Sequence, residues 1–101
     1  MTDSCGAPEQ TATSADEDTR GQVVVAGRVT GAEGPLGGAY VRLLDSAGEF
    51  TGEVQASQDG DFRFYAAQGA WTVRALHRKG NGEASVRADG PGVHKVDITV
   101  G

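Results

Sequence analysis

Residues 58–78 read QDGDFRFYAAQGAWTVRALHR, and this stretch decides the fold class. An Asp-Gly pair, typical of a tight turn, comes first, and two phenylalanines follow at alternating positions, Phe62 and Phe64. After a second glycine, Trp71 and Val73 again alternate with polar side chains. Since the side chains of a β-strand point alternately to its two faces, the pattern predicts two strands whose apolar faces build the core.

The same alternation extends in both directions along the chain. Short segments of period two are separated by clusters of Gly, Pro, Asn and Asp, and no stretch has a helical period. The polar strand over 50–57 is expected at a sheet edge. Seven short strands at close spacing predict an all-β fold, a seven-stranded antiparallel β-sandwich. The expected strand segments are 22–31, 39–45, 50–57, 58–67, 68–78, 83–89 and 92–100.

The start of the chain differs in composition from the rest. Its first 20 residues contain no branched aliphatic or aromatic side chain, so they lack the apolar surface that would offset the entropy lost on ordering. They also contain five acidic side chains against Arg20, which leaves only −1 of the formal charge of −5 for the remaining chain. We therefore expect a disordered acidic N-terminal tail over 1–21 and a β-sandwich domain over 22–101.

Charge and composition exclude several function classes. A nearly neutral domain lacks the clustered Lys and Arg of a nucleic-acid surface, and no segment has the apolar length of a membrane span or a secretory signal. We therefore expect a cytoplasmic protein with no nucleic-acid or membrane partner. One cysteine and two distant histidines predict no metal site and no cofactor, and the turn at Asp59–Asp61 lacks the ligand spacing of a calcium loop.

We predict no catalytic residue. His77 and His94 are interpreted as strand-end histidines, since no nucleophile or acid stands near either one in the sequence. Cys5 is the only thiol, and its polar surroundings predict exposure. The neighbouring Asp3 and Glu9 disfavour a thiolate, so the residues leave open whether this thiol is reactive or incidental.

Basic side chains recur in and after the tryptophan strand. Arg74, Arg78 and Lys79, joined by Arg63 from the preceding strand, are candidates for a basic stripe on an outer sheet face. Such a stripe attracts an anion such as thiosulfate, or the acidic tail of the chain itself. The alternative is ordinary solvated charge on a strand face.

Three segments resemble carboxypeptidase regulatory-like domains, which are transthyretin-like sandwiches: GRV at 27–29 with GPLGGAYV at 34–41, DGDFRF at 59–64, and QGAWTV at 68–73. More narrowly, GGAYVRLLDSAGEFTGEV at 37–54 and GDFRFYAAQGAWTVRAL at 60–76 resemble a family of small uncharacterised actinobacterial proteins of SseC type. Members of that family also share an N-terminal motif, which here consists of Cys5, Gly6, Ala7 and Pro8.

The resemblance implies a role in sulfur metabolism, because genes of the SseC-type family commonly neighbour one for a rhodanese-type thiosulfate sulfurtransferase. It implies a non-catalytic β-sandwich accessory or binding module with that enzyme as protein partner. The alternative is a sulfur-carrier protein that accepts a persulfide sulfur on Cys5. Two further functions are alternatives. A hydroxyisourate hydrolase of the transthyretin-related type has a C-terminal Tyr-Arg-Gly-Ser, whereas this sequence ends Asp-Ile-Thr-Val-Gly, and a sugar-binding platform would have only Tyr40 and Tyr65 as aromatic side chains. The oligomeric state stays open.

Overall fold

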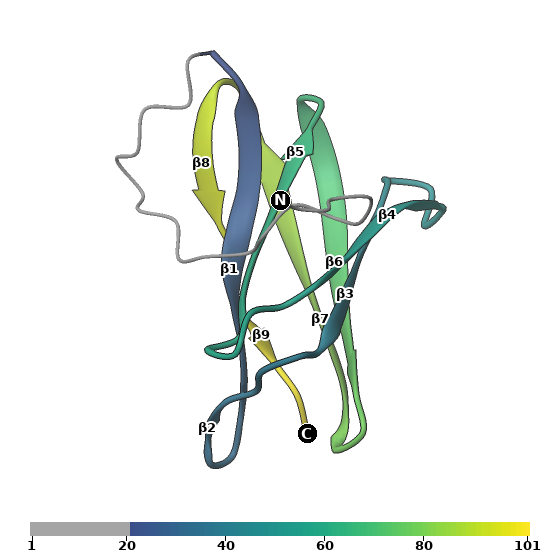
Figure 1. The fold of residues 1–101 in the computed structure, drawn as a ribbon. Helices are drawn as coiled ribbons and strands as arrows, with labels where there is room; N and C mark the ends of the chain where they lie inside the picture. The colour runs from purple at the N-terminus through teal and green to yellow at the C-terminus, as the bar shows by residue number, and fades with distance from the viewer. Residues whose placement is uncertain (1–20) are drawn as a thin grey trace, which may run out of the picture.

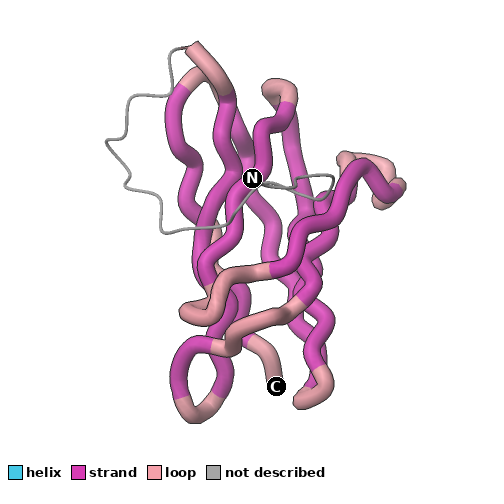
Figure 2. Tube along the Cα trace, in the orientation of Figure 1, coloured by secondary structure: helices cyan, strands magenta, loops and turns pink. Residues whose placement is uncertain are grey.

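The computed structural model describes residues 21–101, and every regular element within them is a β-strand (Figures 1 and 2). The strands pack as two facing sheets, which confirms the predicted all-β sandwich. Their bounds are β1 Val23–Gly31, β2 Gly34–Pro35, β3 Tyr40–Leu44, β4 Phe50–Gln55, β5 Asp61–Ala66, β6 Gly69–His77, β7 Gly80–Ala88, β8 Gly92–Lys95 and β9 Ile98–Thr99.

One sheet has the order β4-β3-β6-β7, and all its neighbours are antiparallel. The other is organised around β1, which pairs antiparallel with β5 and β2 and parallel with β8 and β9. The polar strand β4 lies at the end of its sheet, as its sequence predicts. Figure 1 shows β4 and the preceding turn at one side of the molecule, with β8 at the other.

The strand count of seven was wrong, because residues 21–101 form nine strands. One extra strand is the two-residue β2, in a connection that the glycines and Pro35 had marked as turn only. The other arises because the last expected strand, 92–100, divides into β8 and β9. At the break, the side chain of Asp97 accepts the backbone N–H of Arg28 at 3.0 Å.

A purely antiparallel sandwich was also wrong. Val23 pairs with Gly92 and Val29 with Ile98 in parallel register, so the end of the chain runs alongside its first strand in the same direction. Strand periodicity reports which face a side chain takes, but a parallel partner satisfies that pattern as well as an antiparallel one. The direction of these pairings is therefore a tertiary property.

The core lies between the two sheets and consists of the inward-facing aliphatic and aromatic side chains. Phe62 and Val73, both expected there, are fully buried. Trp71 is half-buried at the margin of the core, where its indole Nε1–H donates to the carbonyl oxygen of Ala67 at 2.8 Å.

The predicted tail over 1–21 falls almost entirely on residues 1–20, which lie outside the described residues. The first strand begins at Val23, within the predicted domain over 22–101. The boundary between tail and domain stays a prediction. Within residues 21–101, no helix has the length and apolar character needed to cross a membrane.

Candidate functional site

The outer face of the four-stranded sheet carries a row of four charged side chains, one from each strand. Glu53 of β4 lies opposite Arg42 of β3, Arg42 lies opposite Arg74 of β6, and Arg74 lies opposite Glu83 of β7. These positions alternate along their strands with buried or half-buried residues such as Val41. The antiparallel register thus assembles the row from strands that are far apart in sequence.

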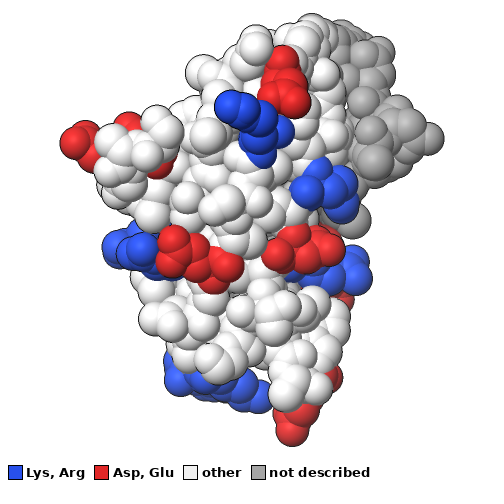
Figure 3. Space-filling view, turned by 180° about the vertical axis from the view of Figure 1, so that it is seen from behind, with Lys and Arg blue, Asp and Glu red and all other residues white. Residues whose placement is uncertain are grey.

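Each arginine in this row pairs with the glutamate on its outer side. Arg42 Nε lies 2.9 Å from Glu53 Oε2, and Arg74 Nη2 lies 3.5 Å from Glu83 Oε1. Like charges directly opposite each other destabilise a sheet, so the glutamates offset the repulsion between the two arginines. The row has no net charge, and acidic and basic side chains are also interspersed over the face seen in Figure 3.

Two large aromatic side chains are exposed beside this row. Tyr40 is 50% exposed at the start of β3, and Phe50 is 62% exposed at the start of β4. The guanidinium of Arg42 lies 6.0 Å from the centroid of the Phe50 ring, within the range of a cation–π contact. We call this surface the aromatic–arginine face and define it by Tyr40, Arg42, Phe50 and Arg74.

The β3–β4 turn determines where Phe50 lies. The Asp45 carboxylate accepts the backbone N–H groups of Ala47 and Glu49, each at 2.9 Å, and Gly48 takes a positive φ of 82°. A carboxylate that accepts two N–H groups holds a tight turn, and only glycine adopts such a φ at little cost. The chain therefore returns with Phe50 directly opposite Leu44.

The structure does not bring the four residues of the predicted basic stripe together. Arg74 and Arg63 lie in different sheets, since β5 pairs with β1 while β6 pairs with β3. Arg78 is exposed in the β6–β7 turn. Lys79, in the same turn, pairs with Glu33 at 3.8 Å, and Arg63 lies over the ring of Tyr65 at 6.0 Å. The stripe was expected from consecutive strands, and the chain crosses between the sheets at that connection.

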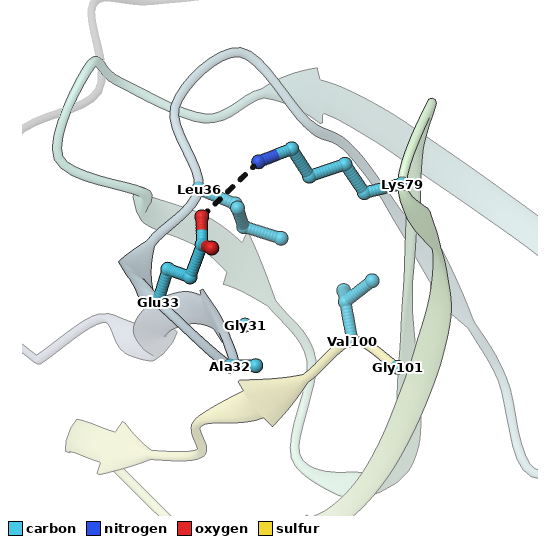
Figure 4. Close-up of a pocket in the computed structure, with 7 residues that line it drawn as sticks. All are labelled: Gly31, Ala32, Glu33, Leu36, Lys79, Val100 and Gly101. Carbon is cyan, nitrogen blue, oxygen red and sulfur yellow. Dashed lines mark ion pairs between the residues drawn. The ribbon is translucent and has the colours of Figure 1, made fainter.

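A pocket of about 270 Å³ opens at the end of the sandwich where the β1–β2 turn meets the β6–β7 turn (Figure 4). Leu36 and Val100 supply its apolar walls, and Glu33 and Lys79 face each other across its mouth. The volume is at the lower end for a small-molecule site, and the two charges at its rim neutralise each other. The pocket suits a small apolar group rather than an ion.

Both histidines take part in local hydrogen bonds; His77 ends its strand, as expected, whereas His94 lies within β8 and not at its end. His77 is the last residue of β6, and its Nδ1 accepts the backbone N–H of Lys79 at 3.1 Å. His94 Nε2 lies 2.7 Å from the carbonyl oxygen of Gly90, which requires the Nε2–H tautomer as donor. Each ring thus stabilises the turn beside it.

The Asp-Gly-Asp segment at 59–61 forms a turn, as predicted. Gly60 takes a φ of 84°, and the Ser57 hydroxyl oxygen accepts the backbone N–H of Asp61 at 3.1 Å. The buried Asp61 carboxylate pairs with Arg28 at 3.1 Å. Among residues 21–101, no group of three or more His, Cys, Asp or Glu side chains is arranged to hold a metal ion.

The predicted thiol site lies outside the described residues. This holds for Cys5 and for the whole motif with Gly6, Ala7 and Pro8. Sequence reasoning also missed the charged row and the pocket. The outward parity of Arg42, Glu53 and Glu83 was readable, but the register that aligns them was not.

Comparison with known protein families gives one family match, which covers residues 5–100 and is described as "Protein of unknown function (DUF1416)". Two relatives from Mycobacterium tuberculosis, Uncharacterized protein Rv0814c and Uncharacterized protein Rv3118, are each 51% identical over 98 residues, covering 95% of this chain and 98% of theirs. A relative from Mycolicibacterium smegmatis, with the name Uncharacterized protein, is 54% identical over 84 residues, covering 82% of this chain and 93% of its own.

Proposed function

Since the chain belongs to the DUF1416 family of uncharacterised actinobacterial proteins, we propose its function from the geometry: a non-catalytic β-sandwich accessory module that binds a protein partner. The proposed docking surface is the aromatic–arginine face. The observation that carries the proposal is the exposure of Tyr40 and Phe50 on one sheet face with Arg42 stacked beside Phe50.

Physical reasons favour this face over the other candidates. Aromatic residues and arginine are enriched at protein interfaces, because aromatic rings bury a large area at low entropic cost and the arginine guanidinium offers several hydrogen-bond donors. The sheet beneath is held by pairing of β3 with both β4 and β6, regular along β6 and with one register shift along β4, so the side chains are presented by a sheet rather than by a loop. The pocket beside Leu36 is small, so we do not propose it as the main binding site.

The proposed partner is a rhodanese-type thiosulfate sulfurtransferase in the cytoplasm. This choice of partner and compartment rests on the resemblance to the SseC-type family described under the sequence analysis. The charged row adds a requirement for the partner, because its glutamates and arginines are spaced across the face with no net charge. A complementary surface would present both signs rather than a single basic or acidic patch.

The test is a calorimetric titration of the protein into a rhodanese-type sulfurtransferase from the same host. We expect the Tyr40→Ala/Phe50→Ala variant to bind about tenfold more weakly or worse, because exposed aromatics at an interface carry much of the binding free energy. The matched control is Tyr65→Ala, which removes an aromatic that is 59% exposed on β5 of the other sheet. The control is expected to bind like wild type.

Three results would contradict the proposal. If the wild-type protein does not bind the sulfurtransferase, the partner is wrong. If the double variant binds like wild type, or if Tyr65→Ala weakens binding as much as the double variant does, the docking face is wrong. Circular dichroism of each variant checks that the fold is retained.

A second candidate function is sulfur transfer through Cys5, which rests on the resemblance to the SseC-type family; Cys5 lies within the residues that the family match covers. The Cys5 thiolate would attack the outer sulfur of a cysteine persulfide on the sulfurtransferase. The sulfur–sulfur bond of the enzyme breaks, a new one forms on Cys5, and the enzyme cysteine leaves as thiolate. The proton of the Cys5 thiol passes to solvent, so no external oxidant is needed.

Intact mass spectrometry tests the carrier function directly. After incubation with the sulfurtransferase and thiosulfate, the wild-type protein should gain the mass of one sulfur atom and Cys5→Ser should gain none. No gain in either protein contradicts the carrier function. The accessory function is unaffected by that result, since it predicts that Cys5→Ser binds the enzyme like wild type.

A further inference from the structure

The strand β7 presents a long, regular backbone edge. Its nine residues pair without interruption with β6, from Gly69 opposite Ala88 to His77 opposite Gly80. Within residues 21–101, no strand pairs with its other side. A row of backbone N–H and C=O groups along such an edge is a template for another strand.

Several features that usually protect an edge are lacking in β7, although its outward-facing side chains include the charged Glu83 and Arg87. Its inward-facing residues before Ala88 are Gly82, Ala84 and Val86, so no charge points toward the core, and the strand has no proline and no bulge. The other edge of the same sheet differs, because β4 has six residues and its pairing with β3 shifts register between Leu43 and Leu44. The two edges are thus unequal as docking sites.

The hairpin that joins β6 and β7 determines which backbone groups face outward. Its two-residue loop closes at the pair His77 and Gly80. This must be a hydrogen-bonded pair, because the alternative would require a hydrogen-bonded pair between the two adjacent loop residues. Hydrogen-bonded pairs recur at every second residue of an antiparallel ladder. The N–H and C=O groups of Glu83, Ser85 and Arg87 therefore point to the open edge.

We propose that a second copy of this chain pairs antiparallel with β7, with Ser85 opposite Ser85 at a two-fold axis. In this register Glu83 of each copy lies opposite Arg87 of the other, which gives two symmetric pairs of opposite charge. The odd-numbered residues that direct their backbone groups outward also lie opposite one another. The two four-stranded sheets join into one eight-stranded sheet, and the outer faces of both copies form a continuous surface.

The charges select this register over its neighbours. If the second copy slides along β7 until Ser85 lies opposite Arg87, Glu83 comes to lie opposite Asp89, which places two like charges together. If the second copy slides the same distance the other way, Glu83 lies opposite Ser85, and the Glu83 carboxylate has no basic side chain opposite it across the interface. Opposite charges across neighbouring strands stabilise a pairing, and like charges destabilise it.

The side chains involved are accessible for this contact. The Glu83 side chain is 52% exposed in its pair with Arg74, and the Arg87 side chain is 71% exposed in a 3.7 Å pair with Asp89. Neither pair is buried, so both side chains can reach a second partner across the edge. The interface requires no rearrangement of the core.

Light scattering after size-exclusion chromatography, over a series from about 1 µM to about 1 mM, tests the proposal. We expect a wild-type dimer whose dissociation constant rises about tenfold or more in Glu83→Arg and in Arg87→Glu, because each variant creates two like-charge pairs. The double variant Glu83→Arg/Arg87→Glu restores opposite charges with the positions exchanged. It should dimerise like wild type.

The matched control is Glu53→Arg, which makes the same charge change and breaks an equivalent ion pair at the other edge of the sheet. It should leave the dimer unchanged. Ser85→Pro removes an edge-facing N–H without removing a bond to β6, and it should yield a folded monomer. A wild-type monomer throughout the series, or a dimer that persists in Ser85→Pro, overturns the proposal. If Glu83→Arg/Arg87→Glu does not dimerise more tightly than the two single variants, the proposed register with Ser85 opposite Ser85 is wrong.

Discussion

Gly27 illustrates how a single hydrogen side chain permits the sheet around β1. A Cβ atom at this position would overlap the backbone carbonyl oxygen of Val96. The absence of a side chain lets the segment between β8 and β9 approach β1, where Val96 N–H donates to Ala26 at 2.8 Å. The close approach also allows the side chain of Asp97 to reach the N–H of Arg28. The parallel addition of the chain end to β1 depends on this glycine.

We predict that Gly27→Ala lowers the free energy of unfolding by about 3 kcal/mol, because the backbone on both sides must move apart. Urea unfolding followed by the fluorescence of Trp71, the single tryptophan, measures the change. Gly52→Ala is the matched control, since a Cβ there meets no atom within 4 Å. It should raise stability slightly or leave it unchanged, and an equal loss in both variants would contradict the packing argument.

At the scale of elements, the β3–β4 hairpin connects a turn to the proposed docking surface. The Asp45 carboxylate organises the turn through Ala47 and Glu49, and Gly48 N–H donates to the Asp45 carbonyl oxygen at 2.8 Å. This turn returns the chain as β4 with Phe50 beside Arg42. The turn therefore determines the position of Phe50, one of the four residues of the aromatic–arginine face.

We predict that Asp45→Ala costs about 1–2 kcal/mol of stability, because two turn N–H groups lose their acceptor. Asp45→Asn keeps an acceptor oxygen and should lose less. Glu49→Ala serves as control, since the turn uses the backbone of Glu49 and not its side chain. Thermal unfolding by circular dichroism measures all three variants. A loss in Glu49→Ala as large as that in Asp45→Ala would refute this account of the turn.

At the scale of the whole molecule, the sandwich is closed by the last residues of the chain. Ile98 is fully buried in the core, and Val100, 4% exposed, donates its N–H to Thr30 at 2.8 Å. Strand β1 can therefore complete its pairing with β9 only after residues 98–100 have reached it. Pairings between opposite ends of a chain are slow to form, so we expect folding in milliseconds to seconds.

We predict that truncation after Val96 removes a large part of the free energy of unfolding of the domain and lowers its unfolding midpoint strongly. The deletion removes Ile98 and Val100 from the core, a loss of about 4 kcal/mol or more, against a total stability of about 5–15 kcal/mol for a small domain. Removal of Gly101 alone is the control, because this residue is exposed, and it should leave the unfolding midpoint unchanged. A truncated chain whose unfolding midpoint equals that of the full chain would show that the residues after Val96 are dispensable.

Much of the fold was predictable from local pattern. Alternation around Phe62 and Val73 identified inward faces, and the polar character of 50–57 identified the edge strand β4. The candidate site was less predictable. Arg63 and Arg74 follow each other in consecutive strands, yet β5 and β6 belong to different sheets. The charged row, in contrast, joins four strands through a register that no local segment encodes.

The sequence alone determined that the chain forms strands, where most turns fall, and which side chains point inward, because each depends on a residue and its close neighbours. Only the tertiary structure decided that β8 and β9 run parallel to β1, that the strands divide between two sheets as they do, and which outward charges meet. The physical reason is that a strand keeps its alternation of inward and outward side chains beside any neighbouring strand whose register matches. The choice among partners is made by packing across the whole core.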